Sequence, residues 1–534
     1  VTAHWEKFFR GQLPEKHTAE QLRSIKEKFL ESAQANVVYG PSSLSEFTRW
    51  RVKMIAEEFL SCSLGLELNT EPEPEEETED SEEEATESPR EAAQDVTQVA
   101  AFPSALQVTL KPSKRKRNNS KSGSGSKRSK SQADTTEEAE DVSAEPLHFL
   151  QCHSKGNSRE DFKTQLWSGV FEPLLDSGAK KDPVVSSSRT VATCGGESVC
   201  LIDCETGTVL KKYKVATEEF FSMAWTTLTM ANSDSRTKSH NILAAAGRRG
   251  IVKLIHVASD FCYGEIKAHK KPIATVCFSP TRETHLFTAS YDKRIALWDI
   301  GIPDSDYNFK ASQLLVLEVL SIPLRLALVP TCPEQYLLAG CESGCCAWNI
   351  KLDKDKKNRT FEAIFQFPDE DGEMTSSHRV DGLAFLNDDV IVSKSSKPGC
   401  IYLWSWSRTF DTKAKGCQRS VTALILAELE WSNTDLSYLT LSTCPAKGYV
   451  FCGDEKGSVW MYNLSSHLTA WSSPAKGKRS EKRIPPTQIL SWPELRANGE
   501  QLTEILVNNV VTDPSFSYLV VLTSVNITAI WKKS

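Results

Sequence analysis

The 534-residue sequence lacks several patterns that would define its class at once. It has no apolar run of about 18 residues, the length a membrane-spanning helix needs, so no membrane partner is expected. No basic segment followed by an apolar one opens the chain, and no secretory signal is expected either. Phosphate loops, the Rossmann glycine fingerprint, the kinase motifs and a Gly-x-Ser-x-Gly elbow are all missing from the sequence. These absences favour a protein that is not an enzyme and needs no cofactor.

Paired Cys-x-x-Cys motifs are also missing, although the chain has 15 cysteines. The densest groups are Cys194/Cys200/Cys204 and Cys341/Cys345/Cys346, and neither is followed by a matching pair of histidines. A zinc site in either group is one interpretation. The favoured one is buried, reduced structural cysteine, and we predict no metal site.

Charge divides the chain into three regions, although its net charge is only −7. The segment 1–66 has apolar residues at helical spacing and is predicted to be an amphipathic helical segment. Residues 67–144 hold an acidic block and then a basic block, with few large apolar residues, which predicts a disordered linker. Residues 145–534 carry 44 basic and 43 acidic residues. This nearly neutral body argues against a bulk phosphate-binding groove.

Two basic clusters in the linker have the spacing of a bipartite nuclear localisation signal. A solvated charge run is the alternative interpretation. The predicted signal residues are Lys114, Arg115, Lys116, Arg117, Lys127, Arg128 and Lys130.

Short alternating apolar runs separated by Gly, Asp, Asn and Pro fill the region 145–534, which predicts an all-β domain. The runs repeat at intervals of roughly 40 to 70 residues. Seven units share the same pattern. Each has a turn of small residues, followed by a strand whose apolar residues end at a polar or aromatic residue. The endings are Leu201-Ile202-Asp203, Leu254-Ile255-His256, Trp298-Asp299, Trp348-Asn349, Leu403-Trp404-Ser405, Met461-Tyr462-Asn463 and Ala529-Ile530-Trp531.

The third unit, from Ala268-His269 to Trp298-Asp299, resembles a WD40 repeat. This resemblance implies a hydrogen-bonded chain within one blade, made by a loop His, a strand hydroxyl, a turn Asp and a strand Trp. The matching residues here are His269, Thr288 (with Ser290 as the other candidate), Asp292 and Trp298. Their role is expected to be structural and not catalytic.

Seven such units predict a seven-bladed WD40 β-propeller, which leaves only short, protected sheet edges. The last unit ends after its third strand. We therefore expect 147–152, just before the first unit, to supply the missing strand and close the ring.

Binding by a propeller is expected on the face where the turns between second and third strands emerge. Register against the third strands places Arg248, Tyr291, Lys397 and Glu455 there. An exposed aromatic residue with flanking charges is the composition of an interface hot spot. The alternative is an ordinary mixed surface. An aromatic cage for methyl-lysine and simple core packing are likewise both open for the 13 tryptophans.

Longer stretches of the sequence resemble the leucine-rich repeat and WD repeat-containing protein 1 family, whose members associate with the origin recognition complex. The stretches that carry the resemblance begin at Val1-Thr-Ala-His-Trp-Glu-Lys-Phe, Tyr39-Gly-Pro-Ser-Ser-Leu-Ser-Glu-Phe, Glu145-Pro-Leu-His-Phe-Leu-Gln-Cys, Ala192-Thr-Cys-Gly-Gly-Glu and Thr284-His-Leu-Phe-Thr-Ala-Ser-Tyr-Asp. The chain begins with Val1, and no leucine-rich repeat pattern is recognisable in its sequence. We therefore expect it to start just after the family's repeats.

The resemblance implies a nuclear scaffold that binds origin recognition complex subunits and holds them on chromatin, especially heterochromatin. It further implies association with trimethyl-lysine marks on histone tails, with methylated DNA and with other replication-licensing factors. The implied locations are the nucleus, centromeres or kinetochores, telomeres and the centrosome, and the implied roles are pre-replication complex assembly, the G1/S transition and silencing.

A substrate receptor of a cullin ubiquitin ligase is the alternative function. Such receptors often carry Trp-Asp-x-Arg, whereas Trp298-Asp299 is followed here by Ile300 and Gly301.

Overall fold

The computed structural model describes residues 106–109 and 144–533, except 176–187, 232–236, 353–357, 360–362, 370–371, 396–398, 412–419, 433, 435, 473–482, 491 and 498. The predicted helical segment 1–66 and the predicted nuclear localisation signal lie outside these residues. Within the described residues, no helix is both long and apolar enough to cross a membrane.

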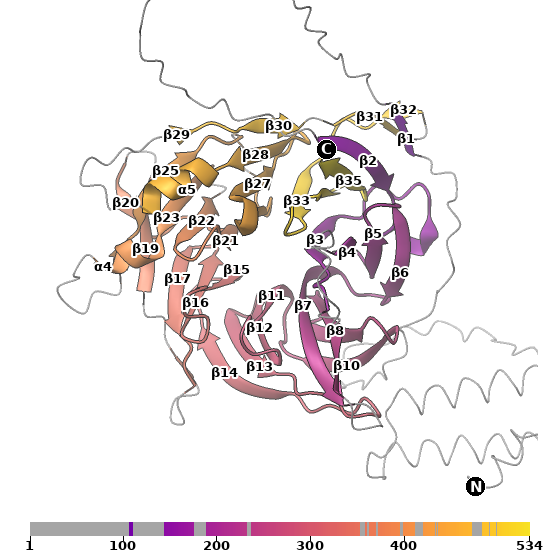
Figure 1. Ribbon diagram of the computed structural model, residues 1–534, viewed down its shortest axis with the longest axis horizontal. Helices are drawn as coiled ribbons and strands as arrows, with labels where there is room; N and C mark the ends of the chain where they lie inside the picture. Colours follow the sequence, from indigo (N-terminus) through magenta and orange to yellow (C-terminus); the bar gives the residue numbers. More distant parts are fainter. Residues whose placement is uncertain are drawn as a thin grey trace, which may run out of the picture. The chain divides into compact units, whose positions relative to one another are not determined.

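The described chain forms seven four-stranded antiparallel blades arranged in a ring, so the predicted seven-bladed propeller is confirmed (Figure 1). Blades 1 to 3 follow one another along the chain. Their strands are β3 (Leu166–Phe171), β4 (Thr190–Gly195), β5 (Ser198–Asp203) and β6 (Thr208–Lys214); β7 (Phe220–Ala231), β8 (Thr237–Gly247), β9 (Ile251–His256) and β10 (Phe261–Lys267); and β11 (Ile273–Phe278), β12 (His285–Ser290), β13 (Arg294–Asp299) and β14 (Ser312–Glu318).

Blades 4 to 6 repeat this order. Their strands are β15 (Pro323–Leu328), β16 (Tyr336–Cys341), β17 (Gly344–Asn349) and β19 (Ala363–Pro368); β21 (Gly382–Phe385), β22 (Val390–Ser395), β23 (Cys400–Ser405) and β25 (Leu424–Leu429); and β26 (Leu441–Cys444), β27 (Tyr449–Gly453), β28 (Val459–Asn463) and β30 (Gln488–Leu490). All seven predicted unit endings lie on third strands.

Blade 7 joins the two ends of the propeller. Its first three strands are β33 (Val507–Thr512), β34 (Tyr518–Thr523) and β35 (Thr528–Lys533). The fourth is β2 (Ala144–Leu150), which pairs with β35 in antiparallel register from Ala144–Lys533 to Leu150–Thr528. Figure 1 shows this indigo strand beside the yellow one. The expected closure is confirmed, with a strand that begins three residues and ends two residues before the predicted 147–152.

Smaller elements extend the blades. Short strands add to outer edges or pair with one another, and short helices follow some third strands or fill connections. They are β1 (Leu106–Thr109), β18 (Asn358–Arg359), β20 (Met374–Thr375), β24 (Ser420–Thr422), β29 (Arg483–Ile484), β31 (Glu494–Ala497), β32 (Glu500–Gln501), α4 (Trp406–Asp411), α5 (Ser465–Ser472), and the 3₁₀ turns η1 (Lys155–Asn157) and η2 (Pro445–Lys447).

One of these strands corrects the expectation for the linker. The stretch 67–144 was expected to be disordered throughout, but β1 pairs in antiparallel register with β31. The sequence of β1, Leu-Gln-Val-Thr, alternates apolar and polar residues, which is a strand pattern that overall composition does not reveal.

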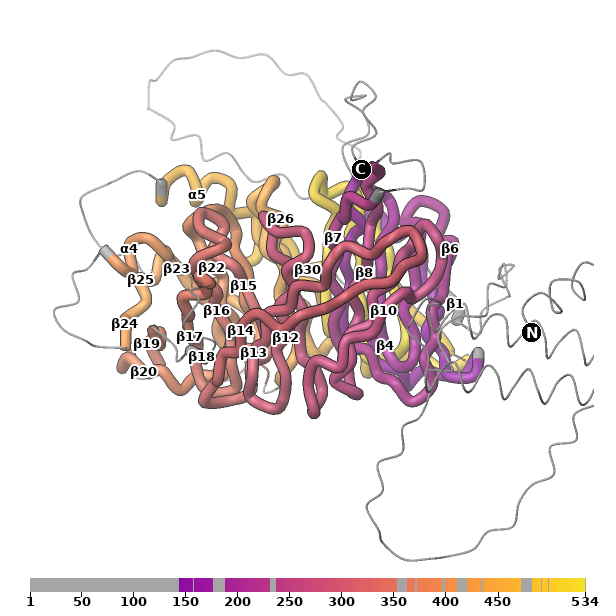
Figure 2. Tube along the Cα trace, turned by 90° about the horizontal axis from the view of Figure 1, so that it is seen from below, coloured from indigo at the N-terminus to yellow at the C-terminus, as the bar shows by residue number. Residues whose placement is uncertain are grey.

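The hydrophobic core lies between neighbouring blades. One cluster joins Leu166 and Ile202 of blade 1 to Val520 and Ile530 of blade 7, and comparable clusters lie between blades 1 and 2 and between each successive pair from blade 3 to blade 7. Second and third strands are buried on both faces and read as continuous apolar runs, whereas the outer strand β6 alternates exposed and half-buried residues. Figure 2 shows the same strands from the side.

Glycine at the end of a second strand lets the backbone of another segment cross close to it. A Cβ at Gly247 would overlap the carbonyl of Glu219, and one at Gly453 would overlap that of Val507. This close approach explains why the repeated turns are rich in small residues.

Candidate functional site

The four residues expected to form a chain in blade 3 lie together. His269 Nδ1 is 2.9 Å from Asp292 Oδ2, and its Nε2 is 2.8 Å from Thr288 Oγ1. Trp298 Nε1 donates to Thr288 Oγ1 over 3.3 Å. Because the Asp292 carboxylate can only accept, Nδ1 of His269 is the protonated nitrogen, and Nε2 accepts from Thr288 Oγ1, which in turn accepts from Trp298. Ser290, the other hydroxyl candidate, donates instead to the carbonyl of Lys271.

Blade 1 contains a related histidine that the sequence reasoning missed. His153 Nε2 lies 2.9 Å from Thr193 Oγ1, and its Nδ1 lies 2.9 Å from Ser198 Oγ. Thr193 holds the same strand position as Thr288, third from the end of the second strand. The Trp position of this blade is occupied by Ile202. Without that tryptophan, nothing in the sequence marked the histidine.

The tryptophan partner is present in blade 5 and missing in blade 4. Trp404 Nε1 donates to Ser393 Oγ over 3.1 Å. The corresponding Trp348 of blade 4 is fully buried, and among the described residues its Nε1 has no hydrogen-bond partner. The residue at the hydroxyl position there is Ala339, which explains the missing bond.

Three of the four residues expected on the binding face lie in described turns between second and third strands, while Lys397 lies outside the described residues. Arg248 pairs with Glu219 and has a side chain that is 63% exposed. Glu455 accepts a hydrogen bond from Thr434. Tyr291 is half-buried, and burial, with Tyr438 and Glu342 nearby, raises its pKa to about 12. Of the three, Tyr291 is the one that belongs to a larger cluster.

That cluster, which we call the Tyr–Arg cluster, consists of Tyr291, Arg325, Glu342, Arg379 and Tyr438. The Arg379 guanidinium donates to Glu342 over 2.8 Å and to the Tyr438 hydroxyl over 3.1 Å, and its carbon lies 5.0 Å from the Tyr438 ring centre. Tyr291 interacts with the Tyr438 hydroxyl. Arg325 lies within β15 of blade 4, and the other four residues lie in connections between strands of blades 3 to 6.

Arg325 extends the cluster towards blade 6. It donates to Thr440, at the start of that blade, and to the carbonyl of Leu324. Burial lowers the pKa of Arg325, while Asp381 and Tyr291 oppose the shift. The Nε atoms of Arg325 and Arg379 are buried and have no hydrogen-bond partner among the described residues. Each guanidinium therefore retains a donor not satisfied within the described part of the protein.

A buried ion pair contacts the backbone of Tyr438. Lys394 Nζ lies 2.7 Å from Asp381 Oδ1, and their side chains are 0% and 1% exposed. Lys394 also lies 4.8 Å from the ring centre of Trp431. The other oxygen of Asp381 accepts from the backbone N–H of Tyr438 over 3.0 Å. This bond holds Tyr438 in a left-handed backbone conformation, with φ of 72°, which is strained for a residue with a Cβ.

A cavity of about 390 Å³ lies elsewhere, lined by first-strand residues of blades 1, 2, 3, 6 and 7. Its lining includes Val170, Trp225, Phe278 and Thr443 and contains no Asp, Glu, Lys, Arg or His. The lining therefore offers apolar contact and a few hydroxyl groups, and it supplies no acid or base.

The two predicted cysteine groups are made of buried free thiols. Burial raises the pKa of Cys194, Cys204 and Cys345, which keeps these thiols protonated. Among the described residues, the one set of three possible ligands within 4.8 Å of one another is Cys152, His153 and Cys200. The sequence grouping included only Cys200 of these three, because the other two lie almost 50 residues earlier in the chain.

Comparison with known proteins identifies similar sequences over the whole chain. The family model for the WD domain of leucine-rich repeat and WD repeat-containing protein 1 matches residues 134–534, and the model for its leucine-rich repeats matches residues 1–55. The mouse protein of that name is 49% identical over 533 residues, which cover 100% of this chain and 78% of the mouse protein. The human protein is 48% identical, covering 99% and 77%.

The match to residues 1–55 overturns the expectation that the chain starts after the family's repeats. Part of the leucine-rich region is present. It was missed because the stretch is short and its apolar residues also fit helical spacing.

Among solved structures, a chain of the polycomb repressive complex 2 of Chaetomium thermophilum resembles the propeller, with a TM-score of 0.51 and 12% identity. The match covers 73% of this chain and 98% of that chain, and it supports the fold.

Proposed function

Because the chain belongs to the leucine-rich repeat and WD repeat-containing protein 1 family, we propose that it is a non-catalytic chromatin scaffold. It recruits the origin recognition complex and stabilises it on chromatin and heterochromatin. In this role it binds histone tails that carry repressive trimethyl-lysine, cooperatively with DNA methylation, and it acts in the nucleus, at centromeres and at telomeres. The resemblance to this family supports these partners. Binding to these partners in turn supports roles in pre-replication complex assembly, the G1/S transition and silencing.

The observation that supports a binding role for the propeller is the composition of the Tyr–Arg cluster. Tyrosine and arginine are enriched at interface hot spots, because tyrosine offers a large, rigid apolar area with a polar tip and arginine offers a planar set of five donors. Here they are held in place by Glu342 and by the backbone bond from Tyr438 to Asp381. A partner that meets this face encounters a pre-organised surface, which lowers the entropy lost on binding.

Leu320, in the connection from blade 3 to blade 4, adds apolar area near this face. Its side chain is 70% exposed. A second exposed leucine, Leu436, lies in the connection that carries Tyr438. Exposed apolar residues beside tyrosine and arginine fit a protein partner better than a nucleic acid, whose backbone calls for a basic surface.

The test is an affinity pull-down from nuclear extract with the full chain, read by quantitative mass spectrometry. We expect origin recognition complex subunits and nucleosomes to be recovered. Tyr291→Ala and Arg379→Ala should each reduce that recovery about tenfold, the effect of losing a hot-spot residue.

Arg483→Ala is the matched control, because Arg483 also pairs with a glutamate, Glu428, but on outer strands of blade 5. It should leave recovery unchanged. Thermal unfolding of each variant checks that the propeller remains folded. Equal recovery by all variants would place the binding surface elsewhere on the chain, and a ligase adaptor as the main stoichiometric partner would support the alternative function.

A further inference from the structure

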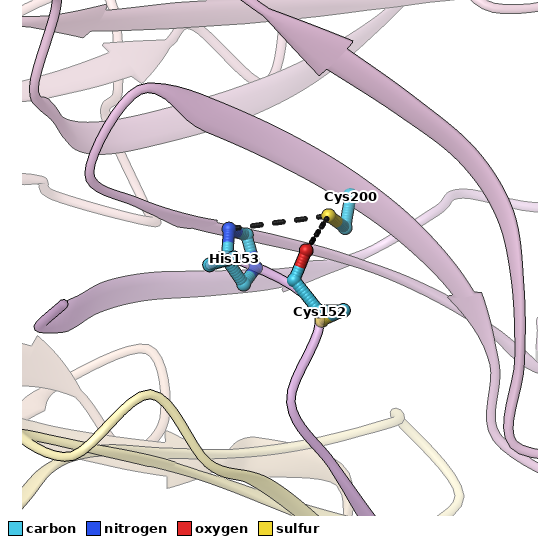
Figure 3. Close-up of side chains that lie close together, drawn as sticks. All are labelled: Cys152, His153 and Cys200. Carbon is cyan, nitrogen blue, oxygen red and sulfur yellow. Dashed lines mark hydrogen bonds between the residues drawn. The ribbon is translucent and has the colours of Figure 1, made fainter. Parts of the chain in front are cut away.

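Two cysteines that are distant in sequence meet where the closing strand leads into blade 1. Cys152 follows the end of β2, and Cys200 lies on β5. Cys200 Sγ is 3.5 Å from the carbonyl oxygen of Cys152 and 3.9 Å from His153 Nδ1 (Figure 3). The two sulfur atoms and Nδ1 all lie within 4.8 Å of one another.

His153 has both ring nitrogens engaged in the blade. Its bonds to Thr193 and Ser198 parallel those that His269 makes in blade 3. A metal ion at this position would have to displace Ser198 from Nδ1, and the described residues place only three possible ligands there. A reaction between the two sulfur atoms requires no such displacement, so the arrangement favours thiol chemistry over metal binding.

The surroundings divide the roles of the two sulfur atoms. The interaction with Cys200 holds the pKa of Cys152 well below its usual range; burial opposes this shift, and the nearby His153 and Lys212 add to it. Burial, and then Cys152 itself, raises the pKa of Cys200. These directions favour Cys152 as the sulfur that reacts as a thiolate, and Cys200, whose S–H donates to the Cys152 carbonyl oxygen, as the second thiol. A thiolate is the nucleophilic form of cysteine.

Solvent exposure distinguishes this cysteine pair from a second cysteine pair in the same protein. Cys152 is half-buried, and Cys200 is fully buried behind it. Cys341 and Cys346 of blade 4 also interact through their side chains, but they are only 1% and 5% exposed. A small oxidant can reach Cys152 more readily than either member of the blade 4 pair.

We propose that Cys152 and Cys200 form an oxidisable pair that a hydroperoxide converts into a disulfide between the closing segment and blade 1. The Cys152 thiolate attacks one peroxide oxygen, the O–O bond breaks, and Cys152 becomes a sulfenic acid while hydroxide leaves and takes a proton. The Cys200 sulfur then attacks Cys152 sulfur and displaces water. In total, two thiols and one hydrogen peroxide give one disulfide and two waters.

The disulfide would tie the chain segment that completes blade 7 to the third strand of blade 1. In the reduced protein these parts are joined by hydrogen bonds, including that between His153 Nδ1 and Ser198 Oγ on β5. A covalent link adds a constraint on the unfolded chain. Oxidation is therefore expected to raise the urea midpoint of the propeller.

The test treats the full reduced chain with an equimolar amount of hydrogen peroxide, and non-reducing peptide mapping then follows each cysteine. We expect a peptide pair linked through Cys152 and Cys200, about 2 Da lighter than the two thiol peptides together. Its yield should exceed that of a Cys341–Cys346 link at least tenfold. The wild-type map alone decides this point and does not depend on any variant.

Variants assign the roles. In Cys200→Ser, Cys152 should accumulate as a sulfenic acid that a cyclic 1,3-dione labels, and in Cys152→Ser, Cys200 should remain a free thiol. Cys332→Ser, which removes a half-buried cysteine elsewhere, is the control and should leave the link unchanged. Oxidation of Cys152 no faster than that of Cys332, or a map without the link, overturns the proposal.

A metal site is tested separately by adding Co²⁺ to the reduced chain. Thiolate-to-cobalt charge-transfer bands that are lost in Cys152→Ser and Cys200→Ser would assign the three residues to metal binding and overturn the thiol proposal. Without such bands, peroxide should form the link equally well in the presence of the ion.

Discussion

At the scale of single residues, the propeller shows how one hydroxyl group can organise a blade. Thr288 is fully buried and is the point where the histidine and the tryptophan of blade 3 meet. His269 Nε2 and Trp298 Nε1 both bond to the Thr288 oxygen, so removal of that oxygen leaves two buried polar groups without partners. The hydroxyl is small, yet its loss is expected to cost more than the loss of an ordinary surface hydrogen bond.

We predict that Thr288→Val lowers the free energy of unfolding by about 2–4 kcal/mol, because His269 Nε2 and Trp298 Nε1 lose their partner. Urea unfolding of the full chain measures the change. Thr208→Val on the exposed outer strand β6 is the control and should shift stability by less than about 0.5 kcal/mol. Similar effects of the two substitutions would contradict the proposed structural role of the four residues.

Blade 4 allows the converse experiment. Ala339→Ser places a hydroxyl where blade 5 has Ser393, opposite the Trp348 Nε1 that lacks a partner. We predict a gain of about 1 kcal/mol in the free energy of unfolding.

Ala347→Ser is the control for this gain, since Ala347 is also buried in the same blade but packs in the cluster shared with blade 5, whereas Ala339 and Trp348 pack in the cluster shared with blade 3. That substitution should destabilise the protein by about 1–3 kcal/mol. A loss of stability for Ala339→Ser comparable to that of the control would show that the site has no room for the oxygen.

A histidine at the end of β9 makes stability depend on pH. Burial, with His240 and Lys211 nearby, lowers the pKa of His256 to about 4 from 6.5. Between pH 6.5 and about pH 4, His256 binds a proton in the unfolded chain but not in the folded chain. The free energy of unfolding therefore falls as the pH decreases through this window. Because each pH unit is worth about 1.4 kcal/mol, the contribution lost between pH 7.5 and pH 5 is about 2 kcal/mol.

We therefore predict that His256→Asn reduces the loss of stability between pH 7.5 and pH 5 by about 2 kcal/mol. An asparagine oxygen can still accept the Ser259 amide that His256 Nδ1 accepts, and it does not titrate. Urea unfolding of wild type and variant at both pH values gives the difference. The same pH dependence in both proteins would show that His256 accepts a proton in the folded state.

At the scale of the element, the connections between strands do more than join them. Asn526, in the turn between β34 and β35, is fully buried in a left-handed conformation with φ of 58°. Its side chain accepts from His153 N–H and donates to Ser154 Oγ and to the carbonyl of Asp161. One turn thus holds the loop that follows the closing strand.

We predict that Asn526→Ala costs about 2–4 kcal/mol in the free energy of unfolding, since it removes three hydrogen bonds and strains the backbone. Asn526→Gly loses the same bonds without the strain and should be about 1 kcal/mol more stable than the alanine variant. Amide hydrogen exchange should show faster exchange in β2 for both variants. Unchanged exchange in β2 would mean that the turn does not hold the closing strand.

The elements also explain what the sequence could and could not predict. Third strands are buried on both faces and end on a repeated pattern, so all seven were found, and the closing strand followed from counting. Tyr438 and Arg379 were missed because they lie in connections of unequal length, where no repeat register exists. Strand β1 was missed because its partner, β31, is almost 390 residues away in the sequence.

His153 shows the limit of a motif at a single position. The residue before it is Cys152 and not glycine, and the tryptophan position of its blade holds Ile202. Only the geometry, with Thr193 at the position of Thr288, identifies it as the counterpart of His269. The same geometry brought Cys152 and Cys200 together, which the spacing of cysteines along the chain did not predict.

At the scale of the whole molecule, charge separates the chain into parts with different tasks. The region 145–534 is nearly neutral, whereas the stretch 111–130 has nine basic residues and no acidic one. The neutral propeller offers few charges for bulk attraction to nucleic acid, so its contacts must be specific. The basic stretch, in contrast, has a composition suited to binding either an import receptor or a nucleic-acid phosphate backbone.

The last prediction concerns this basic stretch. Alanine at Lys114 to Arg117, combined with alanine at Lys127, Arg128 and Lys130, should move a fluorescently tagged chain from the nucleus to the cytoplasm, because seven positive charges are lost from both clusters of the predicted signal. Substitution of Lys351, Arg408 and Lys456 on the propeller is the control for lost charge and should leave the distribution unchanged. Nuclear accumulation of the basic-stretch variant would show that import depends on a partner, and the propeller would then be the part to test for that partner.

Restoring only the first cluster distinguishes a bipartite signal from a single one, since a bipartite signal requires both clusters for full import.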